Sequence, residues 1–141
     1  MMILASQATK SQADVRKLRA PVVYVIDSDR TAREEVRSLL DQHGCLTKAF
    51  AIAARMLDEL DKQPPDLLIT AVDLQDIDGV ELLQRLRQEG RCLPVIAICS
   101  RGDVTSSVRA MRAGAVDCLE KPNFPEELLW NIRQLFPEAA A

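Results

Sequence analysis

The sequence is poor in the residues from which catalytic and metal-binding sites are usually built. It contains one histidine, His43, and four cysteines, none of them in a Cys-x-x-Cys pair. Because His43 lies far along the chain from every cysteine except Cys45, we expect no zinc site. No glycine-rich phosphate loop follows an apolar run, and His43 falls at a helix end, away from any Ser-His-Asp arrangement. We therefore expect no enzyme activity, no cofactor, and cysteines that are buried and reduced.

Long apolar runs and an excess of basic charge are also absent. No apolar run approaches the length that crosses a membrane, and the opening MMILASQATK is too short and too weakly apolar for a signal peptide. The formal net charge is −3, only 4% of the residues are aromatic, and no basic patch with interleaved aromatics occurs. We expect a cytoplasmic protein that binds neither nucleic acid nor a membrane directly.

The chain divides into a short extension and one domain. Residues 1–20 carry four basic side chains against the single acid Asp14, and we expect them to form a flexible or loosely helical extension. Residues 21–141 are enough for one domain with a proper core. No internal repeat or low-complexity tract interrupts them.

From Pro21 onward, short β-branched runs alternate with segments of helical period. The runs that predict strands lie at 22–26, 45–50, 67–69, 95–98 and 116–119. Between them are four apolar stripes, each predicted to share one helix face: Val36, Leu39 and Leu40; Met56, Leu57 and Leu60; Leu82, Leu83 and Leu86; and Val104, Val108 and Met111. The pattern predicts an α/β fold, (βα)₅, in which helices cover both faces of a doubly wound five-stranded parallel sheet. Such sheets bind ligands at the carboxyl ends of their central strands.

Helix-end residues agree with these segments. Asp78 and Asp103 stand where an N-cap carboxylate would accept the first free N–H groups of a helix. Gly44, Gly90 and Gly114 stand where helices would end.

The loop sequence Asp76-Ile77-Asp78-Gly79 partly resembles a calcium-binding loop. In that register the first and twelfth positions, which need carboxylates, would be Leu74 and Arg85. We therefore expect a turn in which Asp78 caps the next helix, with no calcium site.

Three segments, in this order and spacing, resemble the receiver domains of bacterial two-component response regulators. They are VVYVIDSDRTAREEV, PDLLITAVDLQDIDGVELLQRLR and LPVIAICSRGDVTSSVRAMRAGAVDCLEKP. The resemblance covers roughly residues 21–137 and implies the flavodoxin-like receiver fold. In that family an aspartate at the end of the third strand becomes an aspartyl phosphate. Two acids after the first strand help to hold Mg²⁺, and a lysine after the fifth strand contacts the phosphoryl group.

Several of these positions are changed in this sequence. The resemblance places the first acid at Asp27 and the lysine at Lys121, but the second acid falls on Ser28. Counting back from Gly79, it places the phosphoacceptor position at Ala71. Alanine has no nucleophilic oxygen, and the loss of two carboxylates leaves a poor site for Mg²⁺. The resemblance therefore implies a degenerate receiver, or pseudo-receiver, that binds no Mg²⁺.

Asp27 is expected to pair with Lys121 in this pocket, because no other acid competes for the lysine. The alternative is a phosphoacceptor domain that uses a displaced acid such as Asp73, which requires sliding the strand by two residues and shortening the loop by two.

The switch positions of the family are changed as well. A hydroxyl residue after the fourth strand and an aromatic residue on the fifth relay the signal in receivers, and here the resemblance places Cys99 and Cys118 at these positions. The two strands are neighbours in a receiver sheet, so the thiols can lie close together. Two interpretations remain open: a pair of small buried hydrophobes, or a redox switch. A third alternative is a small-molecule sensor in the emptied pocket at Ala71.

A receiver without its switch chemistry can still act through its surface. Receivers commonly dimerise or dock through the fourth helix, fifth strand and fifth helix. In the last helix the apolar stripe leaves Trp130 on the opposite side, where it either anchors a partner or lies flat on its neighbours. Arg109 and Arg112 are expected on the outer face of the fourth helix, as interface charges or as solvated side chains. We expect a phosphorylation-independent interaction or dimerisation module in signal transduction, which controls transcription through a partner or an output domain.

Overall fold

The structure is a computed structural model that describes residues 19–122 and 124–137. The extension predicted for residues 1–20 therefore lies almost wholly outside the described residues. The strands are β1 (Val22–Ile26), β2 (Leu46–Phe50), β3 (Leu67–Ala71), β4 (Val95–Cys99) and β5 (Asp117–Glu120). The helices are α2 (Arg30–Gln42), α3 (Ala53–Leu60), α4 (Gly79–Gln88), α5 (Val104–Arg112) and α6 (Pro125–Leu135).

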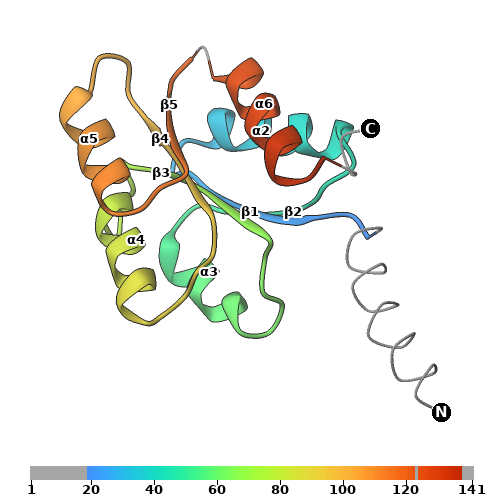
Figure 1. Ribbon diagram of the computed structural model, residues 1–141, viewed down its shortest axis with the longest axis horizontal. Helices are drawn as coiled ribbons and strands as arrows, with labels where there is room; N and C mark the ends of the chain where they lie inside the picture. The colour runs from blue at the N-terminus through green and yellow to red at the C-terminus, as the bar shows by residue number, and fades with distance from the viewer. Residues whose placement is uncertain (1–18, 123, 138–141) are drawn as a thin grey trace.

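The five strands form one parallel sheet in the order β2-β1-β3-β4-β5. Helices α2 and α6 cover one face, and α3, α4 and α5 cover the other (Figure 1). Every residue of β1, β3 and β4 is buried, because side chains from alternate positions enter a core on each side of the sheet. The predicted doubly wound (βα)₅ fold is confirmed.

Most local signals have the predicted effect. The Asp78 carboxylate accepts the N–H groups of Val80 and Glu81 at the start of α4, and Asp103 caps α5 through the N–H of Ser106. Gly44, Gly90 and Gly114 follow α2, α4 and α5, and each has positive φ. In the last helix Leu128 and Ile132 are buried and Trp130 is 59% exposed, as the periodicity predicts.

The apolar stripe predicted on α5 faces solvent, not the core. Val104, Val108 and Met111 are 66%, 43% and 47% exposed, and the helix instead buries the small residues Ser106 and Ala110. Small side chains let the helix backbone approach the sheet closely, and this leaves the apolar stripe at the surface. The consequence is an exposed apolar helix face.

Two further expectations need correction. Cys92 is exposed, so the thiols are not uniformly buried. The fifth strand begins at Asp117, and Val116, which was expected to open it, is 43% exposed in the preceding turn. In the part of the chain that the structure describes, no helix combines the length and apolar character needed to cross a bilayer.

Candidate functional site

The carboxyl end of β3 is fixed by the close approach of Gly79. The N–H of Gly79 donates to the carbonyl of Val72 at 2.8 Å. A Cβ atom at Gly79 would lie 2.9 Å from the Val72 Cα and would collide with the Ala71 carbonyl oxygen. Only glycine therefore fits this position without a backbone shift. This contact sets the length of the loop, so that Ala71, which is 3% exposed, is the last residue of β3.

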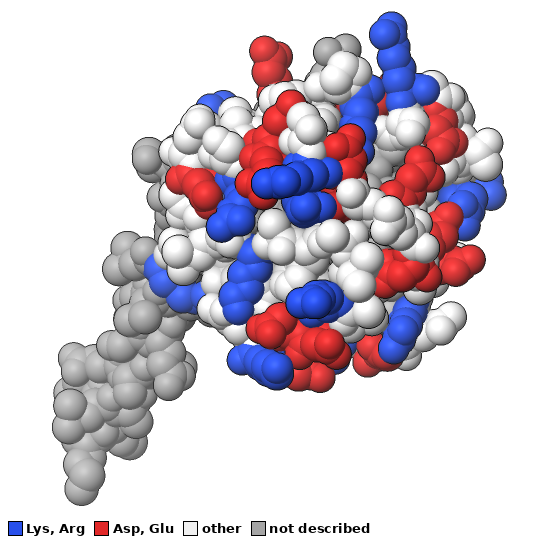
Figure 2. Space-filling view, turned by 180° about the vertical axis from the view of Figure 1, so that it is seen from behind, with Lys and Arg blue, Asp and Glu red and all other residues white. Residues whose placement is uncertain are grey.

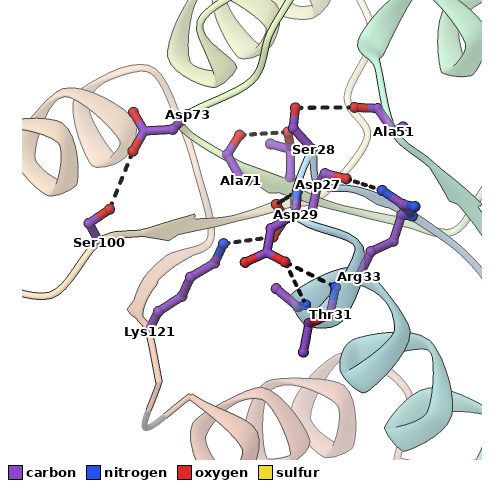
Figure 3. A network of polar contacts seen from close by, with 12 residues as sticks. Asp27, Ser28, Asp29, Thr31, Arg33, Ala51, Ala71, Asp73, Ser100 and Lys121 are labelled. Carbon is purple, nitrogen blue, oxygen red and sulfur yellow. Dashed lines mark hydrogen bonds and ion pairs between the residues drawn. The ribbon is translucent and has the colours of Figure 1, made fainter.

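Asp27 is buried beside this strand end, and both of its carboxylate oxygens have partners (Figure 3). Oδ2 accepts from Lys121 Nζ at 2.9 Å, which is the expected ion pair. Oδ1 accepts the N–H of Asp29 at 2.9 Å, and the Asp29 carboxylate in turn caps α2 through the N–H groups of Thr31 and Ala32. The charge of Asp27 is thus balanced within the chain.

Ser28 links the loops at the carboxyl end of the sheet. Its hydroxyl donates to the carbonyl of Ala51 at 3.3 Å and accepts the N–H of Gln75 at 3.2 Å. One side chain from the β1–α2 loop therefore joins the β2–α3 loop to the β3–α4 loop. A hydroxyl connects these loops at the position where the family resemblance expects a metal-binding acid.

Asp73 lies outside this group. It is exposed, and its Oδ2 accepts the hydroxyl of Ser100 at 3.3 Å. Figure 3 shows it directed toward Ser100, whereas Lys121 is directed toward Asp27. The contact joins the β3–α4 loop to the loop that precedes α5.

Asp76 has a role that the sequence analysis missed. Its carboxylate accepts the N–H groups of Ala53 and Ala54 at 3.1 and 3.0 Å, and so caps α3, whose own N-cap residue Ile52 makes no side-chain cap bond. Desolvation alone would raise the pKa of Asp76, but these backbone donors outweigh it and hold the pKa below its ordinary value. Because donor and acceptor are more than twenty residues apart, no local sequence pattern signals this cap.

The residues at this edge of the sheet do not form a carboxylate cluster. Across residues 19–122 and 124–137, no three His, Cys, Asp or Glu side chains are grouped closely enough to hold a metal ion. Asp27 lies beside Ser28 and Ala71 with Lys121 on its Oδ2, and the carboxylate of neighbouring Asp29 is used at the start of α2.

Comparison with known proteins identifies the family. The sequence profile of the response regulator receiver domain matches residues 23–133. The chain belongs to the receiver domain family of response regulators. It is 34% identical over 115 residues to the response regulator protein TodT of Pseudomonas putida, an alignment that covers 82% of this chain and 51% of TodT. It is 37% identical over 117 residues to the transcriptional regulatory protein FixJ of Bradyrhizobium diazoefficiens, covering 83% of this chain and 57% of FixJ.

Solved structures agree with this assignment. Full-length FixJ from B. japonicum superposes with a TM-score of 0.77 at 33% identity, over 86% of this chain and 60% of that one. The receiver domain of NtrX from Brucella abortus superposes with a TM-score of 0.76 at 27% identity, over 82% of this chain and 98% of that one. This receiver chain spans about half the length of the curated relatives TodT and FixJ.

The two cysteines that the family resemblance places at switch positions, Cys99 and Cys118, are in contact. The Cys118 thiol donates to Cys99 Sγ, with 3.5 Å between the sulfur atoms. Cys99 is 1% exposed, whereas Cys118 is partly exposed. Burial, and then the neighbouring Cys118 thiol, raise the pKa of Cys99 to about 12.

The outer surface of this receiver carries a shallow groove along α5. Val104, Val108 and Met111 line it together with Arg112 and Glu120. The expected outward position of Arg109 needs qualification, because this residue is exposed but its guanidinium lies 3.5 Å from the carboxylate of Asp78 at the start of α4. Arg112 is therefore the arginine that borders the groove.

Proposed function

We propose that this receiver domain acts in two-component signalling by protein–protein interaction that does not depend on phosphorylation. Ala71 at the end of β3 carries the proposal, because an acyl phosphate requires a carboxylate oxygen as nucleophile and alanine has none. The residues around it are held by contacts within the chain: Lys121 on Asp27, and the Ser28 hydroxyl between two loops. These contacts favour a pocket that is locked in one state.

The side chains of the pocket do not fit Mg²⁺. This ion requires hard oxygen ligands in an octahedron and usually keeps one or two protein carboxylates. Here Ser28 and Ala71, next to Asp27, supply no carboxylate, and both oxygens of Asp27 already have partners within the chain. Binding of Mg²⁺ would have to displace Lys121 without gaining a second acid.

Incubation with acetyl phosphate and Mg²⁺, followed by intact-mass measurement, tests the missing chemistry. We expect no added phosphoryl group on the wild-type chain under conditions that label an active receiver domain. Millimolar Mg²⁺ is expected to leave the melting temperature unchanged.

The matched control for that experiment is Asp73→Ala. If the wild type gains one phosphoryl group and Asp73→Ala does not, the alternative of a displaced phosphoacceptor replaces our proposal. A clear rise in melting temperature with Mg²⁺ would also contradict it. The exposed position of Asp73 and its contact with Ser100 favour the expected result, in which the wild type gains no phosphoryl group.

The α5–β5–α6 face is the surface that we propose for the interaction. Its apolar part consists of Val104, Val108 and Met111 on α5, and Trp130 is exposed on α6. An exposed apolar stripe bordered by charges is typical of a docking site, and tryptophan is a frequent anchor of such sites. Arg112 and Glu120 border the groove with opposite charges, which suits a second copy of the chain, since each residue can pair with its counterpart across a two-fold axis.

The distribution of charge also favours a protein partner. Figure 2 shows acidic and basic side chains interspersed around uncharged areas, without a continuous basic region on the face in view. Nucleic acid binding normally relies on such a region. We propose that any control of transcription by this domain passes through a partner or an output domain, as the description of FixJ as a transcriptional regulatory protein suggests.

Substitution in the groove tests this face. Val108→Glu places a charge in the apolar stripe and is expected to abolish concentration-dependent self-association in sedimentation velocity, with no change in the melting temperature. Leu46→Glu is the matched control, because Leu46 is 58% exposed on β2, at the opposite edge of the sheet. The proposed face would be contradicted if both variants lost self-association equally, or if Val108→Glu still self-associated like the wild type.

A further inference from the structure

Cys99 and Cys118 approach each other from diagonal positions on neighbouring strands. The register pairs Cys118 with Ala97, and Cys99 with Glu120, so the cysteines are two residues apart along the sheet. Both side chains belong to the core under α3, α4 and α5. Diagonal neighbours lie roughly 7–8 Å apart between Cα atoms, whereas disulfide-bonded residues mostly lie about 5.5–6 Å apart. The sulfur atoms are in contact, but a bond between them requires β5 to move along β4.

The helix above this pair is held by few buried side chains. Helix α5 buries only Ser106 and Ala110, while its large apolar residues face solvent. Elements with little buried apolar surface are those that shift or open most readily. A displacement of β5 is therefore expected to be transmitted to α5 before the central strands are disturbed.

We propose that Cys99 and Cys118 are a peroxide-sensitive thiol pair, and that their oxidation to a disulfide displaces β5 and α5. The effect on partner binding rests on the function proposed above, because α5 and β5 form part of the proposed interaction face. The oxidation itself does not depend on that function.

The chemistry proceeds in two balanced steps. Cys118, the more accessible thiol, loses its proton and attacks hydrogen peroxide as a thiolate. The O–O bond breaks, the departing hydroxide takes up that proton to become water, and a sulfenic acid remains on Cys118. Cys99 Sγ then attacks the Cys118 sulfur, the S–O bond breaks, and the Cys99 proton leaves in a second water. Two thiols are oxidised and one peroxide is reduced. Cys99 is 1% exposed, whereas Cys118 is partly exposed, so peroxide reaches Cys118 first.

The first experiment uses the Cys92→Ser variant of the full chain. Cys92 is exposed, and it lies with Cys99 in a single tryptic peptide, 92–101, so its removal makes the mapping unambiguous. After treatment with dilute hydrogen peroxide we expect the intact mass to fall by two hydrogen atoms. A non-reducing digest should link peptide 92–101 to the peptide that contains Cys118, and a dithiol reductant should reverse both changes. Buried Cys45 should remain alkylatable only after denaturation.

Cys118→Ser, in the same background, is expected to form no such link. The inference is overturned if Cys118 proceeds to sulfinic acid without linking, or if Cys45 oxidises at the same rate as the pair, which would show that unfolding exposes all the thiols together. In either case the thiols are small core residues and the proposed function is unaffected.

The second measurement is amide hydrogen exchange of the oxidised and reduced forms. We expect lost protection in residues 104–120 on oxidation, and unchanged protection in α2, which packs on the opposite face of the sheet. A disulfide that forms without any change in residues 104–120 would overturn the displacement of α5. Phosphoryl transfer to the wild type, by contrast, would overturn the proposed function and leave the thiol chemistry intact.

Discussion

Gly79→Ala is expected to lower the free energy of unfolding by about 2–3 kcal/mol, because the added methyl group meets backbone atoms that cannot move aside. The nearest of these are the carbonyl oxygen of Ala71 and the Cα atom of Val72, which lies 2.9 Å from the Cβ position. Relief would require the loop to separate from β3 and would weaken the Gly79 N–H bond to Val72. Alanine's better helix propensity offsets about 1 kcal/mol at most, since Gly79 is the first residue of α4.

Gly90→Ala is the comparison for this substitution. Gly90 has a φ of +78° but nothing within 4 Å of its Cβ position. Alanine there is therefore expected to lower the free energy of unfolding only through its left-handed backbone, by about 1–2 kcal/mol. Urea unfolding at constant m-value compares the two variants. If Gly79→Ala lowers the free energy of unfolding by less than Gly90→Ala does, the loop between β3 and α4 can change its length. The position of Ala71 at the strand end, and with it the argument against Asp73, would then be weakened.

The parts of the fold that the sequence predicted are those with local causes. The runs at 22–26 and 95–98 are continuously apolar because helices cover both of their faces, and such runs identify central strands without tertiary information. Asp78 and Asp103 could be assigned as caps because their acceptors and donors lie within three residues of each other. The ion pair of Asp27 with Lys121 was predicted only through the family resemblance, since these residues are distant in sequence.

The features that the sequence did not predict depend on contacts between distant segments. Helix α5 has two candidate inner faces, one large and apolar and one small, and the close approach of the sheet selects Ser106 and Ala110. Asp76 caps a helix more than twenty residues away, and Ser28 connects two other loops. Each requires the assembled carboxyl edge of the sheet. The position of Cys118 beside Cys99 was anticipated as possible because the strand order of the family makes β4 and β5 neighbours.

Lys121→Met is expected to lower the free energy of unfolding by about 1–3 kcal/mol, because it leaves the carboxylate of Asp27 buried without its cation. The Asp27 side chain is only 5% exposed, but that of Lys121 is 30% exposed, and partial solvation of the lysine keeps the effect below that of a fully buried pair. The remaining N–H donor from Asp29 cannot neutralise the charge.

Lys62→Met provides the matched control. Lys62 lies 3.8 Å from Glu59, and its side chain is 71% exposed, so the loss of this surface pair should change stability by less than about 0.5 kcal/mol.

In the double variant Lys121→Met/Asp27→Asn, the loss of stability should be smaller than in Lys121→Met alone, because the unpaired charge is gone. Millimolar Mg²⁺ should not restore the stability of Lys121→Met, since one carboxylate beside Ser28 and Ala71 is too few for the ion. Full restoration by Mg²⁺ would mean that the pocket retains a metal site, and that the lysine of this receiver only occupies the place of the cation.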